Sequence, residues 1–256
     1  MELALDQVYA WLGQLFFPFC RVAAFLMALP IIGTQLVPMR IRLALALPVT
    51  LLVAQVIPAV PSVEPFSGEA FLLIIQQVIL GLAMGFLVQL LFHVFVLGGQ
   101  LIAMQNGLGF STLMDPVNGI NVTSISQLYL MSTNLLFFSL NGHLALIEIL
   151  SDSFYSLPIS LQGYDVQRLF YVAEQGSWMF RGAILVALPA VTALLVVNFV
   201  FGVVSRVAPQ MNIIAVGFPF TMVVGLIIIW LTLGNVLPQF EQLAEESFVM
   251  VRSMVR

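Results

Sequence analysis

Between Glu69 and Asp115 the sequence contains no formally charged side chain. This run is too long for one ordinary membrane span, which needs about 20 apolar residues, and too short for two spans with a normal loop. The whole chain is 61% apolar and 8% charged, whereas a soluble domain carries about 25% charged residues. We therefore expect an all-α, polytopic integral membrane protein.

Apolar segments of span length recur along the chain and contain many prolines and glycines. We expect five or six long apolar helices, bent or interrupted at these residues. The segments run over 8–32, 70–114 (divided near Gly98-Gly99, where a helix could kink or stop), 125–149, 178–204 and 213–237, and 43–57 is shorter.

Two further helices are predicted from their amphipathic patterns. Residues 165–174 place apolar side chains on one face and predict a short helix at an interface. The tail from 239 to 256 has its acids toward the start and its arginines toward the end, which suits the helix dipole.

Arg21 lies near the middle of the first apolar segment. An arginine at that depth costs several kcal/mol unless it faces protein or water. We expect it to point into an assembly, and a purely structural arginine that snorkels or pairs with one carboxylate is the alternative. Asn141 and His143 also need polar partners within the membrane, whereas Gly81 and Gly85 would let another helix approach closely.

The residues needed for most catalytic chemistry are missing. The chain has no lysine, which excludes a Gly-Lys-Ser/Thr phosphate loop and a Schiff base. Cys20 cannot form an internal disulfide, and His93 and His143 alone do not make a metal cluster. No basic cluster indicates nucleic acid, and Glu2 and Asp6 do not fit a cleaved signal peptide. We expect no enzyme and no cofactor.

The central stretch from Met104 to Thr123 combines backbone-breaking residues with apolar ones. Its glycines and Pro116 predict irregular backbone, and its apolar side chains predict that this backbone lies inside a protein-lined cavity at membrane depth. Flexible apolar surface of this kind can close an aqueous path by excluding water. A plain re-entrant or solvent-exposed loop is the alternative. The predicted plug residues are Met104, Gly107, Leu108, Gly109, Phe110, Leu113, Met114, Asp115 and Pro116.

Several motifs in the same order resemble one family. They are RVAPQMN (206–212) followed by GFP (217–219), the spacing of Arg21, Pro30, Pro38, Arg40 and Leu43, QQVILGLAMGF around Gly81 and Gly85, GLGFSTLMDP (107–116), and LNGH (140–143). Over essentially the whole chain the sequence is similar to the FliR family of the flagellar type III secretion export gate, which is related to injectisome export-gate subunits.

The resemblance implies a FliP-like helical part over 1–177 with the plug loop at 104–122, a FliQ-like helical hairpin over 178–237, and an amphipathic helix over 238–256. It implies assembly with FliP-like and FliQ-like subunits and an FlhB-like protein, in the bacterial inner membrane at the flagellar basal body. The gate conducts unfolded flagellar proteins. The residues expected to be buried or to support assembly are Arg21, Asn141, His143, Arg206, Pro209, Gln210 and Asn212.

Other functions stay open at this point. A stand-alone proton-coupled transporter would use Asp115, Glu148 and Arg21 as a coupled site, although Asp115 also fits a loop and Glu148 a helix end. An injectisome gate subunit, or an assembly scaffold without a pore role, would share the same architecture.

Overall fold

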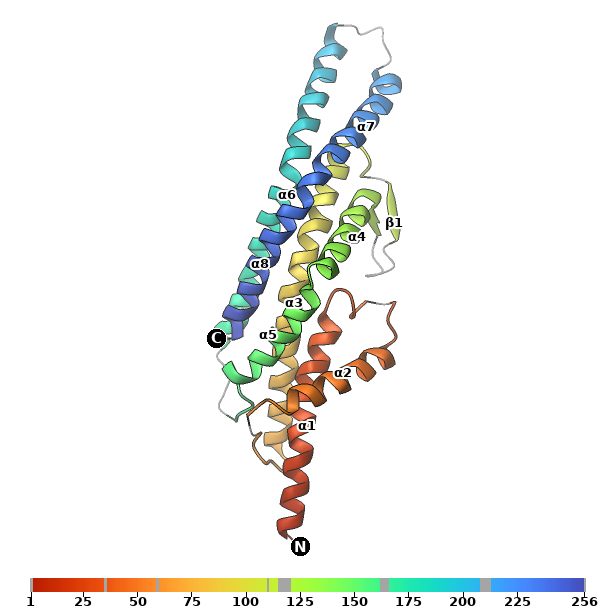
Figure 1. Cartoon of the computed structure of the whole chain (residues 1–256). Coiled ribbons are helices and arrows are strands. Elements are labelled where there is room, and N and C mark those ends of the chain that lie inside the picture. Colours follow the sequence, from red (N-terminus) through yellow and green to blue (C-terminus); the bar gives the residue numbers. More distant parts are fainter. Residues whose placement is uncertain are drawn as a thin grey trace. The chain divides into compact units, whose positions relative to one another are not determined.

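The computed structural model describes residues 2–34, 36–58, 60–109, 111–114, 121–161, 166–207 and 213–255 of the 256-residue chain. These residues form helices almost throughout (Figure 1). In chain order the elements are α1 (Glu2–Ala28), α2 (Met39–Ala54), α3 (Gly68–Gln105), β1 (Thr112–Met114), β2 (Asn121–Thr123), α4 (Ser124–Ser139), α5 (Gly142–Ser156), α6 (Val166–Val207), α7 (Ile213–Thr232), the 3₁₀ helix η1 (Leu233–Asn235) and α8 (Val236–Val255).

Three helical stretches in these described ranges are long and apolar enough to cross a membrane. They are Gly68–Gln105, Gln167–Val204 and Pro219–Val255, and α4 with α5 adds a fourth if this bent pair is one span. The class of polytopic helical membrane protein is thus confirmed. These three or four stretches are fewer than the five or six long apolar helices expected. Over the described residues Leu12–Ala28 is a shorter apolar helix, and the predicted last span continues into the tail.

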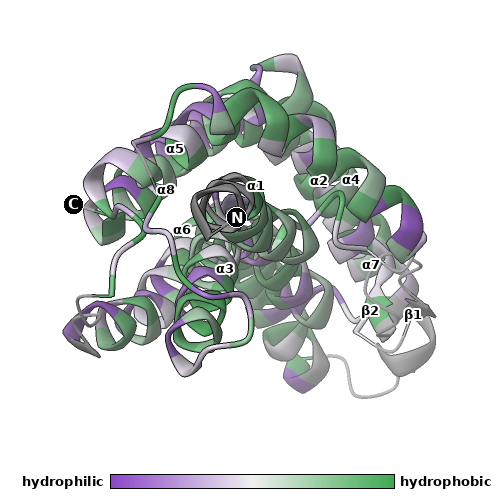
Figure 2. Cartoon of the chain, turned by 90° about the horizontal axis from the view of Figure 1, so that it is seen from below, coloured by the Kyte–Doolittle hydropathy of each residue, from purple (hydrophilic) through white to green (hydrophobic). Residues whose placement is uncertain are grey.

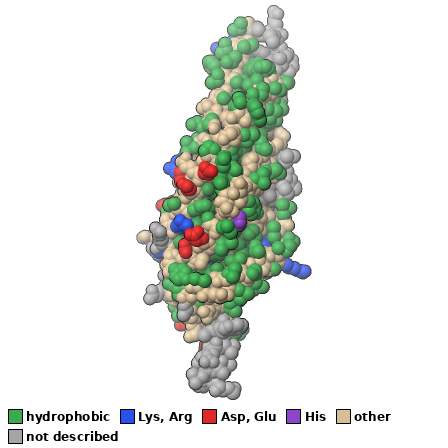
Figure 3. All heavy atoms as spheres, in the orientation of Figure 1, with side chains coloured by type: hydrophobic (Ala, Val, Ile, Leu, Met, Phe, Trp, Pro, Cys, Tyr) green, Lys and Arg blue, Asp and Glu red, His purple; other side chains and the backbone are tan. Residues whose placement is uncertain are grey.

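The helices present apolar side chains outward as well as inward. Hydrophobic residues predominate along them (Figure 2), and hydrophobic side chains are spread over the whole face seen in Figure 3, where charged side chains are few. Leu52, Phe199 and Trp230 are each at least two-thirds exposed. Surfaces of this kind suit lipid or a neighbouring subunit better than water.

Several residues expected to break helices lie inside them. Gly98 and Gly99 do not end α3, which continues to Gln105, and Pro189 lies within α6. The predicted short interface helix at 165–174 is wrong, because those residues that the structure describes are the first turns of α6. By contrast, the predicted span 125–149 is divided at Asn141, whose φ is 55°. Proline and glycine are weak helix breakers in membrane helices, so their positions do not define the ends.

The chain divides into two compact units. The first contains Met1–Leu90, Leu140–Gly176 and Glu246–Arg256, and the second contains Leu91–Ser139 and Ser177–Glu245. The long helices α3, α6 and α8 contribute to both. The expected division into 1–177, 178–237 and 238–256 stays a prediction.

In the first unit, α1 packs against α3 at two small residues. A Cβ atom built on Gly81 would lie 2.8 Å from the Cβ of Ala24 and 2.8 Å from the backbone nitrogen of Phe25, and one built on Gly85 would lie 3.1 Å from the Phe25 carbonyl oxygen. The two backbones therefore approach as closely as glycine allows, as in the small-residue interfaces of membrane helices.

In the second unit, aromatic side chains of α3 fill the core. The ring of Phe92 packs edge-on against Phe137 of α4 at 5.4 Å, and the ring of Phe95 lies 5.9 Å from Phe240 of α8. These rings are buried, so α3 is central to the packing of this unit.

The central stretch is not wholly irregular, and this corrects the sequence prediction. Strands β1 and β2 pair antiparallel, with Thr112 opposite Thr123 and Met114 opposite Asn121. Threonine and valine favour such pairing, and the breakers Asp115, Pro116 and Gly119 fall between the strands, in 115–120, which lie outside the described residues. We call residues 111–124 the central hairpin.

Candidate functional site

The Arg21 side chain lies at the centre of a buried polar cluster in the first unit. It is fully buried, and Nε donates to Gln77 Oε1 of α3 at 2.8 Å. Nη1 donates to the carbonyl oxygen and the hydroxyl of Ser153 at 2.8 and 3.1 Å, and Nη2 donates to the Leu157 carbonyl at 2.8 Å. Arg21 therefore does not snorkel, and its own chain supplies these hydrogen bonds.

The position of these acceptors explains how a charge is stabilised there. Ser153 lies in the last turn of α5 and Leu157 follows its end, so the guanidinium lies at the negative end of the helix dipole. The centre of the Phe154 ring is 4.1 Å from the guanidinium carbon, which adds a cation–π contact. The planar group with five N–H donors matches acceptors from two helices at once.

The other residues expected to be buried or to support assembly are placed differently. Asn141 is exposed and forms the turn before α5, where its carbonyl accepts the Leu144 N–H at 2.9 Å. His143 is half-buried, and Arg206 is exposed in the last turn of α6. Pro209, Gln210 and Asn212 lie outside the described residues.

The central hairpin follows a defined helix end. Gly107 has a φ of 76°, its N–H donates to the Met104 carbonyl at 3.3 Å, and the Leu108 N–H donates to the Ala103 carbonyl at 2.9 Å. This is the Schellman arrangement, in which glycine takes the left-handed conformation and closes the last turn. The direction in which the chain leaves α3 is thus fixed at Gly107.

The two ends of the hairpin are held together. The Ser124 N–H donates to the Ser111 carbonyl, and their hydroxyls hydrogen bond, both at 3.2 Å. Thr123 caps α4, because its hydroxyl accepts the Ser126 N–H at 3.2 Å. The hairpin therefore has an ordered base at the start of α4.

A glutamine of α3 connects this base to the long helix. Gln100 Oε1 accepts from the Thr123 N–H at 3.4 Å and from the Ser126 hydroxyl at 3.3 Å. Gly99 allows the approach, since a Cβ atom built on it would lie 2.7 Å from the Ser126 Cα. The base is thus attached to both α3 and α4.

The structure places only part of the predicted plug. Met104 is 61% exposed in the last turn of α3, and Leu108 and Gly109 are half-buried. The backbone of Leu113 and Met114 lies in β1, while Phe110, Asp115 and Pro116 are outside the described residues. The structure therefore locates the segment without describing the side chains of its tip.

Sequence reasoning missed the polar partners. Gln77 and Gln100 are amides within the long uncharged run, and Thr123 and Ser126 stand next to a helix start. An amide inside an otherwise apolar helix needs a hydrogen-bonding partner, and this was the available signal. The sequence does not say which residue is the partner.

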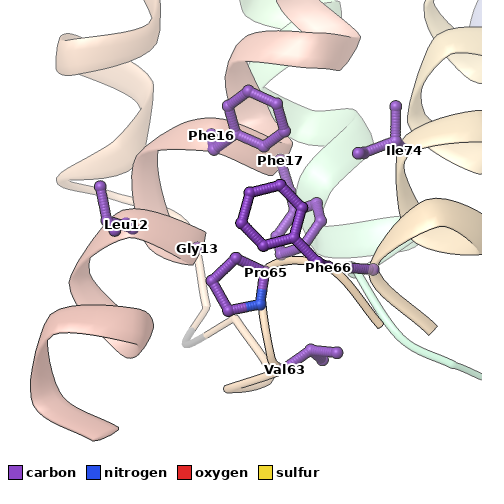
Figure 4. A pocket seen from close by; sticks show the side chains of 9 residues that line it. Leu12, Gly13, Phe16, Phe17, Val63, Pro65, Phe66 and Ile74 are labelled. Carbon is purple, nitrogen blue, oxygen red and sulfur yellow. The ribbon is translucent and has the colours of Figure 1, made fainter. Parts of the chain in front are cut away.

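A pocket of about 250 Å³ lies between α1, the segment before α3 and the first turns of α3 (Figure 4). Its lining residues are Leu12, Gly13, Phe16, Phe17, Val63, Pro65, Phe66, Ala70 and Ile74. The lining offers no acid, base or nucleophile. No group of three or more His, Cys, Asp or Glu residues that could hold a metal occurs in the part of the chain that the structure describes.

These features define a polytopic helical membrane protein in which buried polar clusters hold the helices together and the paired strands β1 and β2 interrupt the apolar helices. The profile of the bacterial export proteins, family 1, matches residues 12–247, so the chain belongs to this family.

The relatives are flagellar. The chain is 34% identical to the flagellar biosynthetic protein FliR of Escherichia coli (strain K12) over 255 residues, which are 100% of this chain and 97% of that protein. It is 37% identical to FliR of Pectobacterium carotovorum subsp. carotovorum over 238 residues, 93% and 89% of the two chains. FliR of Bacillus subtilis (strain 168) is 26% identical over 82% of each chain. The resemblance noted in the sequence is thus confirmed.

Proposed function

We propose that this chain is the FliR-type subunit of the flagellar type III export gate and that its central hairpin closes the pore. In this proposal it assembles with FliP-like and FliQ-like subunits and an FlhB-like protein in the bacterial inner membrane, at the flagellar basal body. The assembled gate conducts unfolded flagellar proteins.

The ordered base of the central hairpin is the observation that carries this proposal. Ser111 and Ser124 hold its two ends together, and Gln100 attaches it to α3. A connection that only joins two helices needs no such base. A segment that blocks a path must keep its position against moving water and ions, and an attachment to two helices provides this.

The composition of the predicted plug, from Met104 to Pro116, supports closure of the pore by excluding water. Its apolar residues Leu108, Phe110, Leu113 and Met114 would exclude water from a narrow path, and methionine adapts its shape to the opposite wall. Gly107 sets where the segment leaves α3.

The alternatives have less support. In the described residues Arg21 bonds to neutral oxygens of Gln77, Ser153 and Leu157, and Glu148 is exposed and pairs with Arg252 at 3.4 Å. These contacts do not join Arg21 and Glu148 in one proton-coupled site. The flagellar names of the relatives favour a flagellar gate over an injectisome gate.

The experiment removes the hairpin while keeping its base. Deleting residues 113–122 joins Thr112 to Thr123, which face each other as Cα partners. Facing residues of antiparallel strands are about 4.5–5.5 Å apart, and a trans peptide spans about 3.8 Å, so the new bond needs only a small shift. The cap of α4 by Thr123 is retained.

We expect the variant to copurify with the partner subunits and to raise the ion conductance of the gate in planar bilayers. The exchange Leu113→Met with Met114→Leu, which keeps an apolar hairpin, is the matched control and should stay closed. An assembled deletion variant with unchanged conductance would contradict the closure role. A chain that is stable and transports on its own would favour the transporter alternative.

A further inference from the structure

The end of α3, just before the central hairpin, contacts the late helices α6 and α7. Asn106 follows the last residue of α3 and is only 2% exposed. Among the described residues, neither its amide nitrogen nor its amide oxygen has a hydrogen-bond partner. Such an amide loses its hydrogen bonds to water without replacing them, so packing stability alone does not account for an asparagine here.

The Asn106 amide lies against Gly225 of α7. A Cβ atom built on Gly225 would lie 2.8 Å from the Asn106 Nδ2 and closer still to its Oδ1. Real Cβ atoms essentially never lie this close, so any side chain at position 225 would have to displace the Asn106 amide. Both residues belong to the second unit.

A second contact joins α6 to α3 at Gln105, the residue before Asn106. The Asn198 side chain donates from Nδ2 to the Gln105 carbonyl oxygen at 3.3 Å. This carbonyl is in the last turn of α3 and cannot be used within the helix, because the chain turns away at Gly107. Thus α6 and α7 hold two consecutive residues, Gln105 and Asn106.

We infer that α6 and α7 set the position of the central hairpin through these two contacts, with Asn106, Gly225 and Asn198 as positioning residues. This inference rests on the proposed function of the hairpin as the closure of the pore. Gly107 has a fixed left-handed conformation directly after Asn106. A displacement of Asn106 by α7 therefore displaces the hairpin that follows.

The test uses the assembled gate with full-length chains and follows the hairpin by thiol labelling. Cys20 is the only cysteine of this chain, so Cys20→Ser combined with Ser111→Cys leaves one thiol at the hairpin base, where Ser111 is exposed. The rate of maleimide labelling is read from this chain's band on a gel. The ion conductance is measured on the same preparations.

Gly225→Ala should raise the labelling rate and the ion conductance several-fold, because its methyl pushes the Asn106 amide away. Gly234→Ala is the matched control, since a Cβ atom there meets nothing within 4 Å, and it should behave like the parent.

Asn198→Ala provides a second route if Gly225→Ala does not assemble. This substitution removes the hydrogen bond to the Gln105 carbonyl. Because Asn198 is exposed, the change should not disturb the packing, and it should raise the labelling rate at least twofold. Assembled Gly225→Ala or Asn198→Ala gates that label like Gly234→Ala would overturn the inference.

The outcomes separate this inference from the proposed function. Faster labelling without added conductance would keep the positioning role and count against closure by the hairpin. A leaky deletion of 113–122 together with unchanged labelling in both positioning variants would keep closure and overturn the positioning role.

Discussion

Replacing Arg21 by methionine tests whether the buried polar cluster holds the first unit together. Methionine fills much of the space with a flexible apolar chain, so the cavity contribution is small. The Ser153 carbonyl keeps the hydrogen bond from the Leu157 N–H at 3.0 Å, whereas Gln77 Oε1 and the Leu157 carbonyl lose the donor described above.

The magnitude follows from these two acceptors. A buried acceptor left without its donor costs about 1–3 kcal/mol, and the Leu157 bond is only partly buried, so we expect a loss of about 2–4 kcal/mol for the pair. In a chain of this size each kcal/mol lowers the melting temperature by about 2–4 °C. The expected shift is therefore roughly 4–16 °C. Arg21→Lys keeps the charge but not the planar group, so its melting temperature should lie between those of the parent and Arg21→Met.

The assay follows Cys20, the only cysteine, which is half-buried beside Arg21. The purified gate is heated in steps with a maleimide dye, and the midpoint temperature of labelling of this chain is read from a gel. The midpoint is compared instead of the rate, because the charge next to Cys20 differs between variants. Arg40→Met, at an exposed position of α2, is the matched control and should change stability by less than about 0.5 kcal/mol. The reasoning is refuted if Arg21→Met has the same midpoint temperature as Arg40→Met.

Three further predictions use the same melting assay. Gly81→Leu should cost about 3 kcal/mol or more by forcing α1 away from α3, whereas Gly176→Leu, where a Cβ atom meets nothing within 4 Å, should melt near the parent. Thr123→Ala removes the cap of α4 and should lower the stability by about 1 kcal/mol, whereas Thr123→Ser keeps a capping hydroxyl and should melt near the parent. Equal losses of stability in the two variants would contradict the capping role. Glu148→Gln breaks the ion pair with Arg252, in which the Glu148 side chain is 64% exposed and the Arg252 side chain 46% exposed. The substitution should therefore lower the stability by less than about 1 kcal/mol, and the loss should vanish in high salt.

The class of protein and most of its helices were predictable from the sequence because the bilayer imposes a strong condition on composition. A run without charge from Ala70 to Met114 has few alternatives to a membrane helix. The helix ends were less predictable. Gly98 and Gly99 lie inside α3 because close neighbours, Val186 at Gly98 and Ser126 at Gly99, use the space they leave, and these neighbours are distant in sequence.

The candidate site was predictable in position but not in form. The breakers near Pro116 indicated a special segment, and they hid the pairing of Thr112–Met114 with Asn121–Thr123. Strand pairing of three residues leaves almost no periodic signal, because each strand is shorter than the window in which alternation can be recognised. The base formed by Ser111 and Ser124 depends on the same pairing and could not be inferred without it.

Three polar side chains inside this apolar chain have one property in common, which is that each binds a neighbouring element. Arg21 binds α3 and α5, Gln100 binds the hairpin base, and Asn198 binds the end of α3. Apolar side chains pack against lipid almost as well as against one another, so they specify helix neighbours weakly in a membrane. A hydrogen bond has a direction and one partner. We therefore expect the few polar contacts to determine which helices meet, and the apolar residues to determine only that the chain lies in the membrane.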